Sequence, residues 1–213
     1  MKTEELVSLL AARVEPIDPS LTARRYRLAL TGGLIGALVL CCGLLGLNPR
    51  LSHETAQPMF WIREAYCSAL AFLGLVAVTR LARPGLRMGF VTTALGCVLC
   101  LMWALAAHDM LTAPAGQHAR LIFGSTAAVC PFLIAMVSAP LFVGYMWMLR
   151  SLAATHLSCA GAAGGFAAGS LGALVYSLHC PELAPPFIGI WYLLGISIPT
   201  AIGTAFGPRL LRW

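Results

Sequence analysis

Six long apolar stretches, separated by short polar segments, constrain this chain more than any other feature. A helix rises about 1.5 Å per residue, so about 20 apolar residues cross a hydrocarbon core about 30 Å thick. The stretches are Leu28–Leu47, Ala65–Leu81, Met88–Ala107, Leu121–Leu149, Ser158–Leu178 and Pro186–Phe206. With 59% hydrophobic and 10% charged residues, the chain exceeds what a water-soluble domain can bury. Strand-like alternation is absent, and lipid-exposed backbone must be satisfied within each segment. The sequence therefore predicts an all-α membrane protein, a bundle of six transmembrane helices spanning residues 28–213.

The fourth stretch is too long for one straight span and contains Pro131 and Pro140. Counted back from Arg150 as the inner anchor, about 19 residues reach Pro131, which places Cys130 near the outer boundary. A proline there bends or starts a helix, so we expect residues 121–129 to lie obliquely or at the interface.

Lysine and arginine fall mainly on one side of the predicted spans. That side carries Lys2, Arg13, Arg24, Arg25, Arg27, Arg80, Arg83, Arg87, Arg150, Arg209 and Arg212, and the other carries only Arg50, Arg63 and Arg120. The positive-inside rule then predicts a bacterial inner-membrane protein with both termini in the cytoplasm. The net charge of +6 is explained by this rule and by anionic membrane lipid, so we expect no direct contact with nucleic acid.

The first 27 residues are the only sizeable segment outside the predicted membrane domain. Thr3 can cap a short amphipathic helix, which Pro16 and Pro19 would end. Its apolar stripe is Leu6, Val7, Leu10 and Val14. Such a stripe can lie on the membrane or bind a protein groove. The acidic first turn favours a protein partner in the cytoplasm.

Two cysteines adjoin prolines, in Cys130-Pro131 and His179-Cys180-Pro181. Hydropathy places both near the outer face, where an oxidising compartment would allow a disulfide if their Cα atoms lie within about 7 Å. The residues alone leave open a reactive pair or two unrelated small apolar side chains. Cys67 is an alternative partner for either thiol. Cys97-x-x-Cys100 falls in mid-span, away from water, and is interpreted as packing.

Histidines on the predicted outer side offer a second kind of chemistry. They are His53, His108, His118 and His179. Together with Cys130 and Cys180 they are candidate ligands for a soft or borderline metal ion, although none has the paired spacing of a preformed site. His179 stands out because it adjoins Cys180 and can favour its thiolate. The others are interpreted as interfacial polar residues.

Other patterns indicate packing and argue against catalysis or transport. The fifth stretch carries Gly161, Gly165, Gly169 and Ala173 at steps of four, which indicates a close helix contact. Acidic residues fall at predicted helix ends or in outer loops, unlike the internal charges of carriers. No hydrolase, phosphate-binding or metalloprotease motif is present, so no enzymatic activity and no cofactor are expected.

Several segments along nearly the whole chain resemble one known family. They are Met1-Lys2-Thr3-Glu4-Glu5-Leu6, Leu9-Leu10-Ala11, Arg24-Arg25, Cys130-Pro131, Tyr176-Ser177-Leu178-His179-Cys180, Trp191-Tyr192 and Gly207-Pro208-Arg209-Leu210-Leu211-Arg212-Trp213. In these segments the chain is similar to the NrsF-type negative regulators of sigma-F, which are six-span membrane anti-sigma factors. The resemblance implies that the leader holds an extracytoplasmic-function sigma factor at the inner membrane. It also implies that Cys130 and Cys180 take part in sensing oxidative or heavy-metal stress.

Two other functions stay open at this stage. A membrane thiol oxidoreductase coupled to a quinone would need a paired cysteine motif on the outer face, and the close doublets lie inside spans. A small transporter would need internal charge or inverted repeats, which the sequence lacks.

Overall fold

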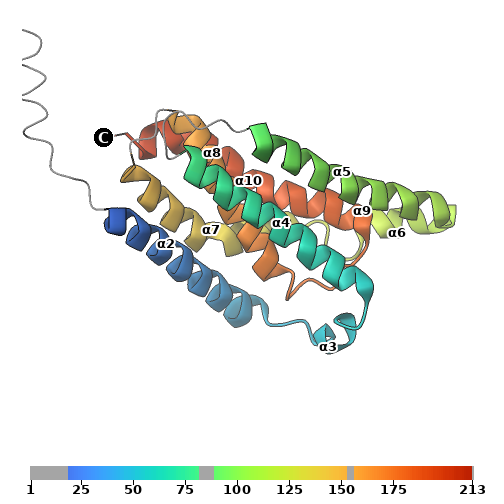
Figure 1. Cartoon of the computed structure of the whole chain (residues 1–213). Coiled ribbons are helices and arrows are strands. Elements are labelled where there is room, and N and C mark those ends of the chain that lie inside the picture. The colour runs from blue at the N-terminus through green and yellow to red at the C-terminus, as the bar shows by residue number, and fades with distance from the viewer. Residues whose placement is uncertain (1–18, 82–88, 153–155, 213) are drawn as a thin grey trace, which may run out of the picture.

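The structure is a computed structural model that describes residues 19–81, 89–152 and 156–212, and all regular secondary structure in these ranges is helical (Figure 1). Six helical segments are long and apolar enough to cross a membrane, as predicted. The transmembrane elements are α2 (Pro19–Leu40) with a π-helical turn η1 (Cys41–Leu45), α4 (Pro58–Leu81), α5 (Gly89–Thr112), α7 (Cys130–Arg150), α8 (Leu157–Tyr176), and α9 (Pro185–Phe187) continued by the π-helical turn η3 (Ile188–Tyr192) and α10 (Leu193–Leu210). The connections contain α3 (Leu51–Glu54), the 3₁₀ turn η2 (Ala115–Gln117) and α6 (His118–Phe123).

Prolines and one glycine set several of these boundaries. Pro131 occupies the first turn of α7, and Pro185 and Pro186 occupy the first turn of α9, where a missing N–H group costs no helical hydrogen bond. Gly46 ends the first span with a φ of 78°, a backbone conformation that favours glycine.

The long fourth stretch is divided as the prolines predict. Residues 124–129 form turns after α6, and α7 begins only at Cys130. The second span, in contrast, begins at Pro58, before the predicted Ala65. The predicted start was wrong because Arg63 and Glu64 resembled a polar boundary, whereas both lie inside α4.

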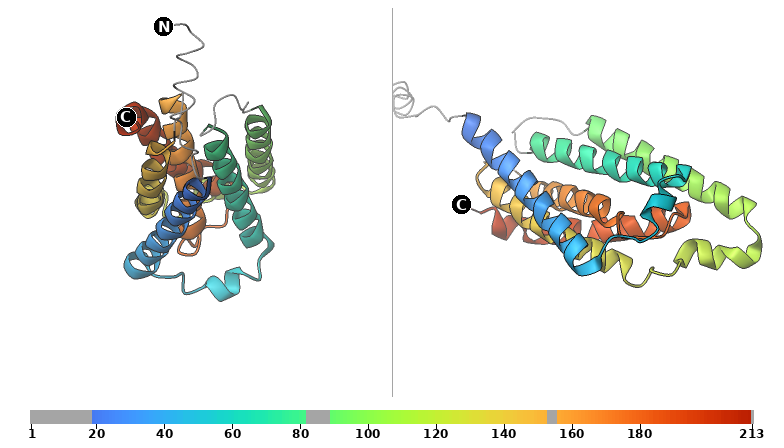
Figure 2. Two further views of the ribbon diagram at one scale, coloured as in Figure 1. Left: turned by 60° about the vertical axis from the view of Figure 1, so that its left-hand side comes forward. Right: turned by 90° about the horizontal axis from the view of Figure 1, so that it is seen from below.

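The bundle is arranged around α8, which packs against α4, α7 and α10, while α2 lies against α7. Helix α5 stands at the periphery and contacts α4 and α9. The start of α2 and the end of α10 lie at one end of the bundle, which we call the terminus end (Figures 1 and 2). Helices α3, α6 and α9 lie at the opposite end, which we call the loop end.

Glycines on α8 and α10 bring these two helices into backbone contact. A Cβ at Gly161 would meet the backbone oxygen of Gly203, and one at Gly165 would meet that of Pro199. Gly169 would place a Cβ 3.0 Å from the Cα of Ile196. The predicted small-residue stripe is therefore a packing face, and we call these contacts the glycine seam.

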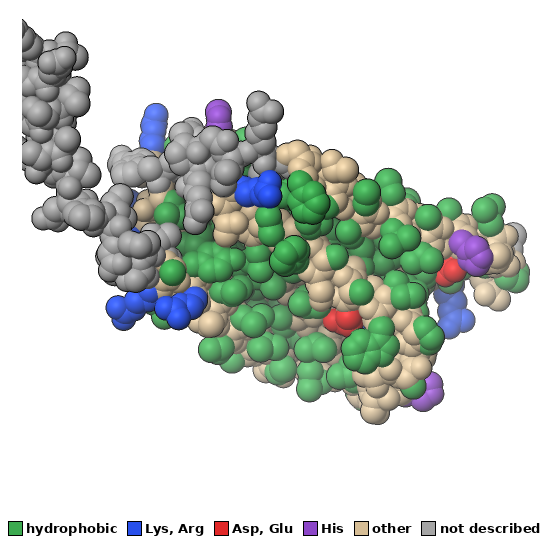
Figure 3. Space-filling model, viewed as in Figure 1, with side chains coloured by type: hydrophobic (Ala, Val, Ile, Leu, Met, Phe, Trp, Pro, Cys, Tyr) green, Lys and Arg blue, Asp and Glu red, His purple; other side chains and the backbone are tan. Residues whose placement is uncertain are grey.

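The outer surface of the bundle matches a membrane environment. Large apolar side chains such as Ile35, Phe72, Leu101 and Phe132 are exposed on it, and hydrophobic atoms cover most of the visible flank (Figure 3). Arginine side chains gather beside the terminus end in the same view. The predicted amphipathic stripe of the leader lies in residues 1–18, outside the described residues, and α2 already begins at Pro19.

Candidate functional site

Cys130 and Cys180 meet inside the loop end of the bundle. Both are free thiols with 0% of their surface exposed, and each lies in hydrogen-bonding contact with the other. Cys130 is the first residue of α7. Cys180 lies in the connection between α8 and α9, residues 177–184, which begins with turns at residues 177–179 and continues without regular secondary structure. The structure therefore brings together the two cysteines singled out by sequence. That this end of the bundle faces an oxidising compartment stays a prediction, and in the structure neither side chain reaches the protein surface.

Local sequence explains how each thiol reaches this place. The Cys130 N–H donates to the carbonyl of Thr126 at 2.9 Å, which closes the turn just before Pro131 starts α7. The Cys180 N–H donates to the carbonyl of Tyr176 at 3.1 Å, which ends α8. Prolines on either side of residues 182–184 prevent a helix from continuing there, so the chain crosses the end of the bundle before α9 begins.

The thiol pair belongs to one buried cluster. Cys67, Tyr66, Tyr176, Tyr192, Phe187 and Ile134 are among its members. Tyr176 comes from α8 and faces both thiols, and Tyr192 comes from the π-helical turn η3. Cys67, the alternative partner named from sequence, is buried beside Cys180 in the same cluster.

Arg63 fastens the segment that carries Cys180. Its side chain is 0% exposed, and one terminal nitrogen donates to the carbonyls of Cys180 at 2.9 Å and Glu182 at 3.1 Å. The other terminal nitrogen donates to the carbonyl of Ser177 at 2.9 Å, and Nε lies 3.3 Å from the Glu64 carboxylate. A buried guanidinium needs such partners because an unpaired charge in a low dielectric costs several kcal/mol, about 3–5. Arg63 thus holds three carbonyls of the connection between α8 and α9.

Sequence reasoning missed this role, although a signal was present. Arg63 was counted as an outer-loop charge in the orientation argument. The residues before it, Pro58–Ile62, are mostly apolar and begin with a proline, a pattern that indicates a helix start. A charge several residues inside a span needs a buried partner, which marks such a residue as a structural or functional candidate.

Two further loops are tied to the same segment. The Nδ1 of His179 donates to the carbonyl of Gly46 at 2.9 Å, and the Asn48 N–H donates to the carbonyl of Leu178 at 3.1 Å. The His179 ring lies against Tyr176, with centroids 5.7 Å apart. The predicted candidate His179 therefore connects the end of the first span to residues 177–184.

Glu182 joins the α6–α7 connection to this segment. Its Oε1 accepts hydrogen bonds from the Ser125 N–H at 2.7 Å and the Ser125 hydroxyl at 2.6 Å. The Trp191 indole N–H donates to the carbonyl of Ile122 at 2.8 Å. Residues 177–184 consequently contact α4, α7 and two loops, so a movement of this segment would be felt by much of the loop end.

The surroundings of the two thiols differ in charge. The pKa of the Cys180 thiol is lowered by the hydrogen bond from Cys130, and further by the Glu182 backbone N–H, the Tyr192 hydroxyl and the Arg63 charge. Burial opposes this because it disfavours a thiolate, but the donors outweigh it. Cys130 instead faces Tyr176, Cys180 and the negative charge of Glu182.

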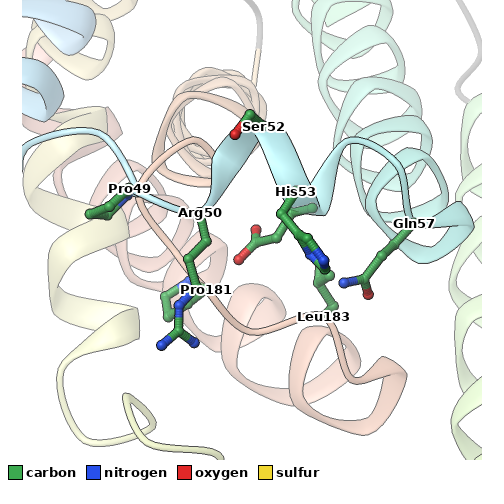
Figure 4. A pocket seen from close by; sticks show the side chains of 8 residues that line it. Pro49, Arg50, Ser52, His53, Gln57, Pro181 and Leu183 are labelled. Atoms are coloured by element: carbon green, nitrogen blue, oxygen red, sulfur yellow. The ribbon is translucent and has the colours of Figure 1, made fainter.

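Two cavities flank residues 181–184. The larger, of about 710 Å³, opens beside α3 and is lined by Pro49, Arg50, Ser52, His53, Glu54, Gln57, Pro181 and Leu183 (Figure 4). The smaller, of about 390 Å³, is lined by Gln117, Arg120, Leu121, Gly124, Ser125, Glu182 and Ala184. Neighbouring side chains of residues 181–184 alternate between the two cavities, and Arg50 extends toward Pro181 in Figure 4.

The other predicted candidates are distributed differently. Cys97 and Cys100 are exposed on the flank of α5, away from the buried cluster. Within the described ranges, no three His, Cys, Asp or Glu side chains are grouped so as to hold a metal ion. The candidate metal ligands Cys130 and Cys180 thus form a two-thiol site. The partner-binding candidates Leu6, Val7, Leu10 and Val14 lie outside the described residues.

Comparison with known proteins gives one consistent result. The family described as negative regulator of sigma F, NrsF, matches residues 10–213. A probable anti-sigma-F factor NrsF of Azospira oryzae is 43% identical over 213 residues, which covers 100% of both chains. The anti-sigma-F factor NrsF of Caulobacter vibrioides is 35% identical over 222 residues, again covering 100% of both. No solved structure matches the chain.

Proposed function

The chain belongs to the NrsF family of negative regulators of sigma F, and we propose that it acts as an integral membrane anti-sigma factor. In this proposal it holds an extracytoplasmic-function sigma factor at the bacterial inner membrane. It releases that factor when the Cys130–Cys180 pair is oxidised or binds a heavy-metal ion. The observation that carries the proposal is the contact between these two thiols inside the loop end.

The distribution of charge supports an orientation with both termini in the cytoplasm. The described arginines at the terminus end are Arg24, Arg25, Arg27, Arg80, Arg150, Arg209 and Arg212, and those at the loop end are Arg50, Arg63 and Arg120. Arg63 is buried and bound to carbonyls, so it adds nothing to the surface charge of the loop end. The surface asymmetry is therefore larger than the sequence count, and it favours a periplasmic loop end.

The leader is the proposed binding segment for the sigma factor. It precedes α2 at the terminus end, and its apolar stripe suits a groove on a helical partner. Leu6→Asp and Leu10→Asp place charge on this stripe and should raise basal sigma-dependent transcription. Retained repression would move the binding surface to the inner connection at residues 80–87.

Release requires the thiol chemistry to change the packing of the loop end. A covalent or metal-mediated link between Cys130 and Cys180 fixes the start of α7 to the segment between α8 and α9. Shifting a protein from mostly bound to mostly released takes a differential interaction of about 5 kcal/mol. Disulfide formation or thiolate ligation is large enough to supply it.

The direct test replaces both thiols. The double variant Cys130→Ser, Cys180→Ser is compared with a matched control, Cys97→Ser, Cys100→Ser, which changes two exposed cysteines of α5. Sigma-dependent transcription is measured with and without an oxidant or a heavy-metal salt. The first variant should lose induction and the control should keep it. Normal induction in the first variant would reject a sensory role for the pair.

A further inference from the structure

We propose that Cys180 is the thiol that reacts first with an oxidant, that Cys130 is the resolving thiol, and that Arg63 is the positioning residue that holds Cys180 for both steps. This order rests on the proposed function, in which the thiol pair senses oxidants. It adds to that function the order in which the two thiols react and the part that Arg63 plays in both steps.

The two sulfur atoms have unequal surroundings. Cys180 receives hydrogen bonds from the Cys130 thiol and the Glu182 backbone N–H, and it lies near the Arg63 guanidinium. These groups favour the thiolate, which is the nucleophilic form of cysteine. The pKa of Cys180 is lowered accordingly. Cys130 donates to Cys180 and lies near the Glu182 carboxylate, so its surroundings offer less support to a negative charge.

Arg63 makes this asymmetry a property of the fold. It binds the carbonyls of Ser177, Cys180 and Glu182, which fixes the backbone on both sides of the reactive sulfur. Its own position is fixed by Glu64 at 3.3 Å and by the Phe60 ring, whose centroid lies 5.2 Å from the guanidinium carbon. Glu64 neutralises part of the charge, but the guanidinium still acts on Cys180 because both groups are buried.

Access also differs between the thiols. Pro181 and Leu183 line the cavity of about 710 Å³, and Glu182 and Ala184 line the cavity of about 390 Å³. Neither thiol lines a cavity itself, but Cys180 is bonded to Pro181, which lines the larger one, whereas neither chain neighbour of Cys130 lines either cavity. A small shift of residues 181–184 would open a path to Cys180 first.

The proposed steps balance for a hydroperoxide as oxidant. The Cys180 thiolate attacks the distal oxygen, an S–O bond forms and the O–O bond breaks. The sulfur loses two electrons to the peroxide, and the alkoxide leaves and takes up a proton as an alcohol. The Cys130 sulfur then attacks the sulfenic sulfur of Cys180. The S–S bond forms as the S–O bond breaks, and hydroxide leaves with the Cys130 proton as water.

The first experiment determines which thiol is oxidised first. Full-length Cys130→Ser and Cys180→Ser variants in lipid nanodiscs are treated with hydrogen peroxide and dimedone, and adducts are located by mass spectrometry. Serine at 130 keeps a hydrogen-bond donor for Cys180. We expect at least about fivefold more adduct on Cys180 of the first variant than on Cys130 of the second, following the thiolate fraction. Equal or reversed labelling, or no adduct on Cys180, overturns the order.

The second experiment separates the charge of Arg63 from its geometry. Lysine keeps the positive charge, so Arg63→Lys should keep the pH midpoint of Cys180 alkylation by iodoacetamide. It lacks the planar fork that holds the backbone beside Cys180, so attack by Cys130 should be slower and the Cys180–dimedone adduct should accumulate. Arg63→Gln should raise the midpoint. For a rise of one pH unit, alkylation should be about tenfold slower at a pH well below both midpoints, where the rate follows the thiolate fraction. The exposed Arg209→Gln, at the end of α10, is the matched control.

Two results would overturn the role of Arg63. They are a wild-type rate of disulfide formation in Arg63→Lys and an unchanged midpoint in Arg63→Gln. If Arg63→Gln does not fold, as judged by thermal unfolding, the Arg63→Lys result decides. These readouts use the purified chain alone. Reversed labelling therefore overturns only the order of reaction, whereas unchanged stress induction in the double-serine variant overturns the proposed function.

Discussion

The loop end and the glycine seam are held together by different kinds of contact. At the loop end, the buried Arg63 binds backbone carbonyls of residues 177–184, the connection that carries Cys180. Along the glycine seam, α8 and α10 touch through backbone atoms, with no titratable side chain between Gly161 and Gly203 or between Gly165 and Pro199. Hydrogen bonds to a loop can be rearranged by chemistry at one atom, whereas packed helices move only as bodies.

This contrast suggests that the loop end and the glycine seam have different roles in the proposed mechanism. The segment 177–184 follows α8 directly and precedes α9 and α10, so a change at Cys180 acts on both helices of the seam. Under the proposed mechanism the seam would keep those two helices together, so that a displacement at the loop end would move them as a pair. Variants at the glycine seam should therefore change the free energy of unfolding without changing the reactivity of Cys180, whereas variants at Arg63 should change both.

The largest effect is expected at Arg63. Arg63→Met keeps the volume but leaves the carbonyls of Ser177, Cys180 and Glu182 without their donor, and leaves Glu64 without its ion pair. The free energy of unfolding should fall by about 4 kcal/mol, because unsatisfied buried groups cost about 1–3 kcal/mol each and partly relax. Thermal unfolding in detergent measures the loss. Arg120→Met, at an exposed site, should lower the free energy of unfolding only slightly. An equal loss in both variants would contradict a stabilising role for the hydrogen bonds of Arg63.

The next effect tests the other region. Gly165→Ala puts a Cβ against the carbonyl oxygen of Pro199 and forces α8 away from α10. The unfolding free energy should fall by about 2–3 kcal/mol, the cost of overpacking a close contact. The rate of Cys180 alkylation should stay within about twofold of wild type, because no donor to its sulfur changes.

The control for this prediction is Gly96→Ala on α5, where a Cβ meets nothing within 4 Å. Its stability should stay within about 0.5 kcal/mol of wild type. A tenfold change in Cys180 alkylation in Gly165→Ala, with no change in Gly96→Ala, would show that the glycine seam and the thiol site behave as one unit.

The two regions also differ in how much of them sequence could predict. The six spans and the packing role of Gly161, Gly165 and Gly169 follow from hydropathy and spacing, which are local properties of the chain. The role of Arg63 depends on carbonyls more than a hundred residues away, and backbone carbonyls leave no mark in a sequence. Pro131 predicted where α7 begins. The proximity of Cys130 to Cys180 depends on how α7 packs against the end of α8, which single-sequence patterns do not determine.

His179 offers a smaller change at the loop end. His179→Phe keeps a ring against Tyr176 but removes the hydrogen bond to the carbonyl of Gly46. The loss should be about 1 kcal/mol, typical of one neutral hydrogen bond. Since His179 gives no hydrogen bond to Cys180 in the structure, alkylation of that thiol should change little.

His108→Phe, at an exposed histidine near the same end, is the control for ring replacement. A strong fall in Cys180 reactivity only in His179→Phe would give the imidazole a direct part in the thiol chemistry.

The smallest effect is expected at Glu182, whose two contributions are separable. Its backbone N–H donates to the Cys180 sulfur, while its carboxylate accepts from Ser125 in a partly exposed position. Glu182→Gln keeps the N–H and one acceptor oxygen, and solvent competes for the lost charge, so the cost should be about 0.5 kcal/mol. Cys180 alkylation should stay within about twofold, because the groups that favour the thiolate are unchanged.

Asp109→Asn, at the end of α5, controls for the loss of one negative charge at the loop end. A tenfold slower alkylation in Glu182→Gln alone would mean that the tie to Ser125 positions the thiol, and that the α6–α7 connection belongs with Arg63 in holding the reactive segment.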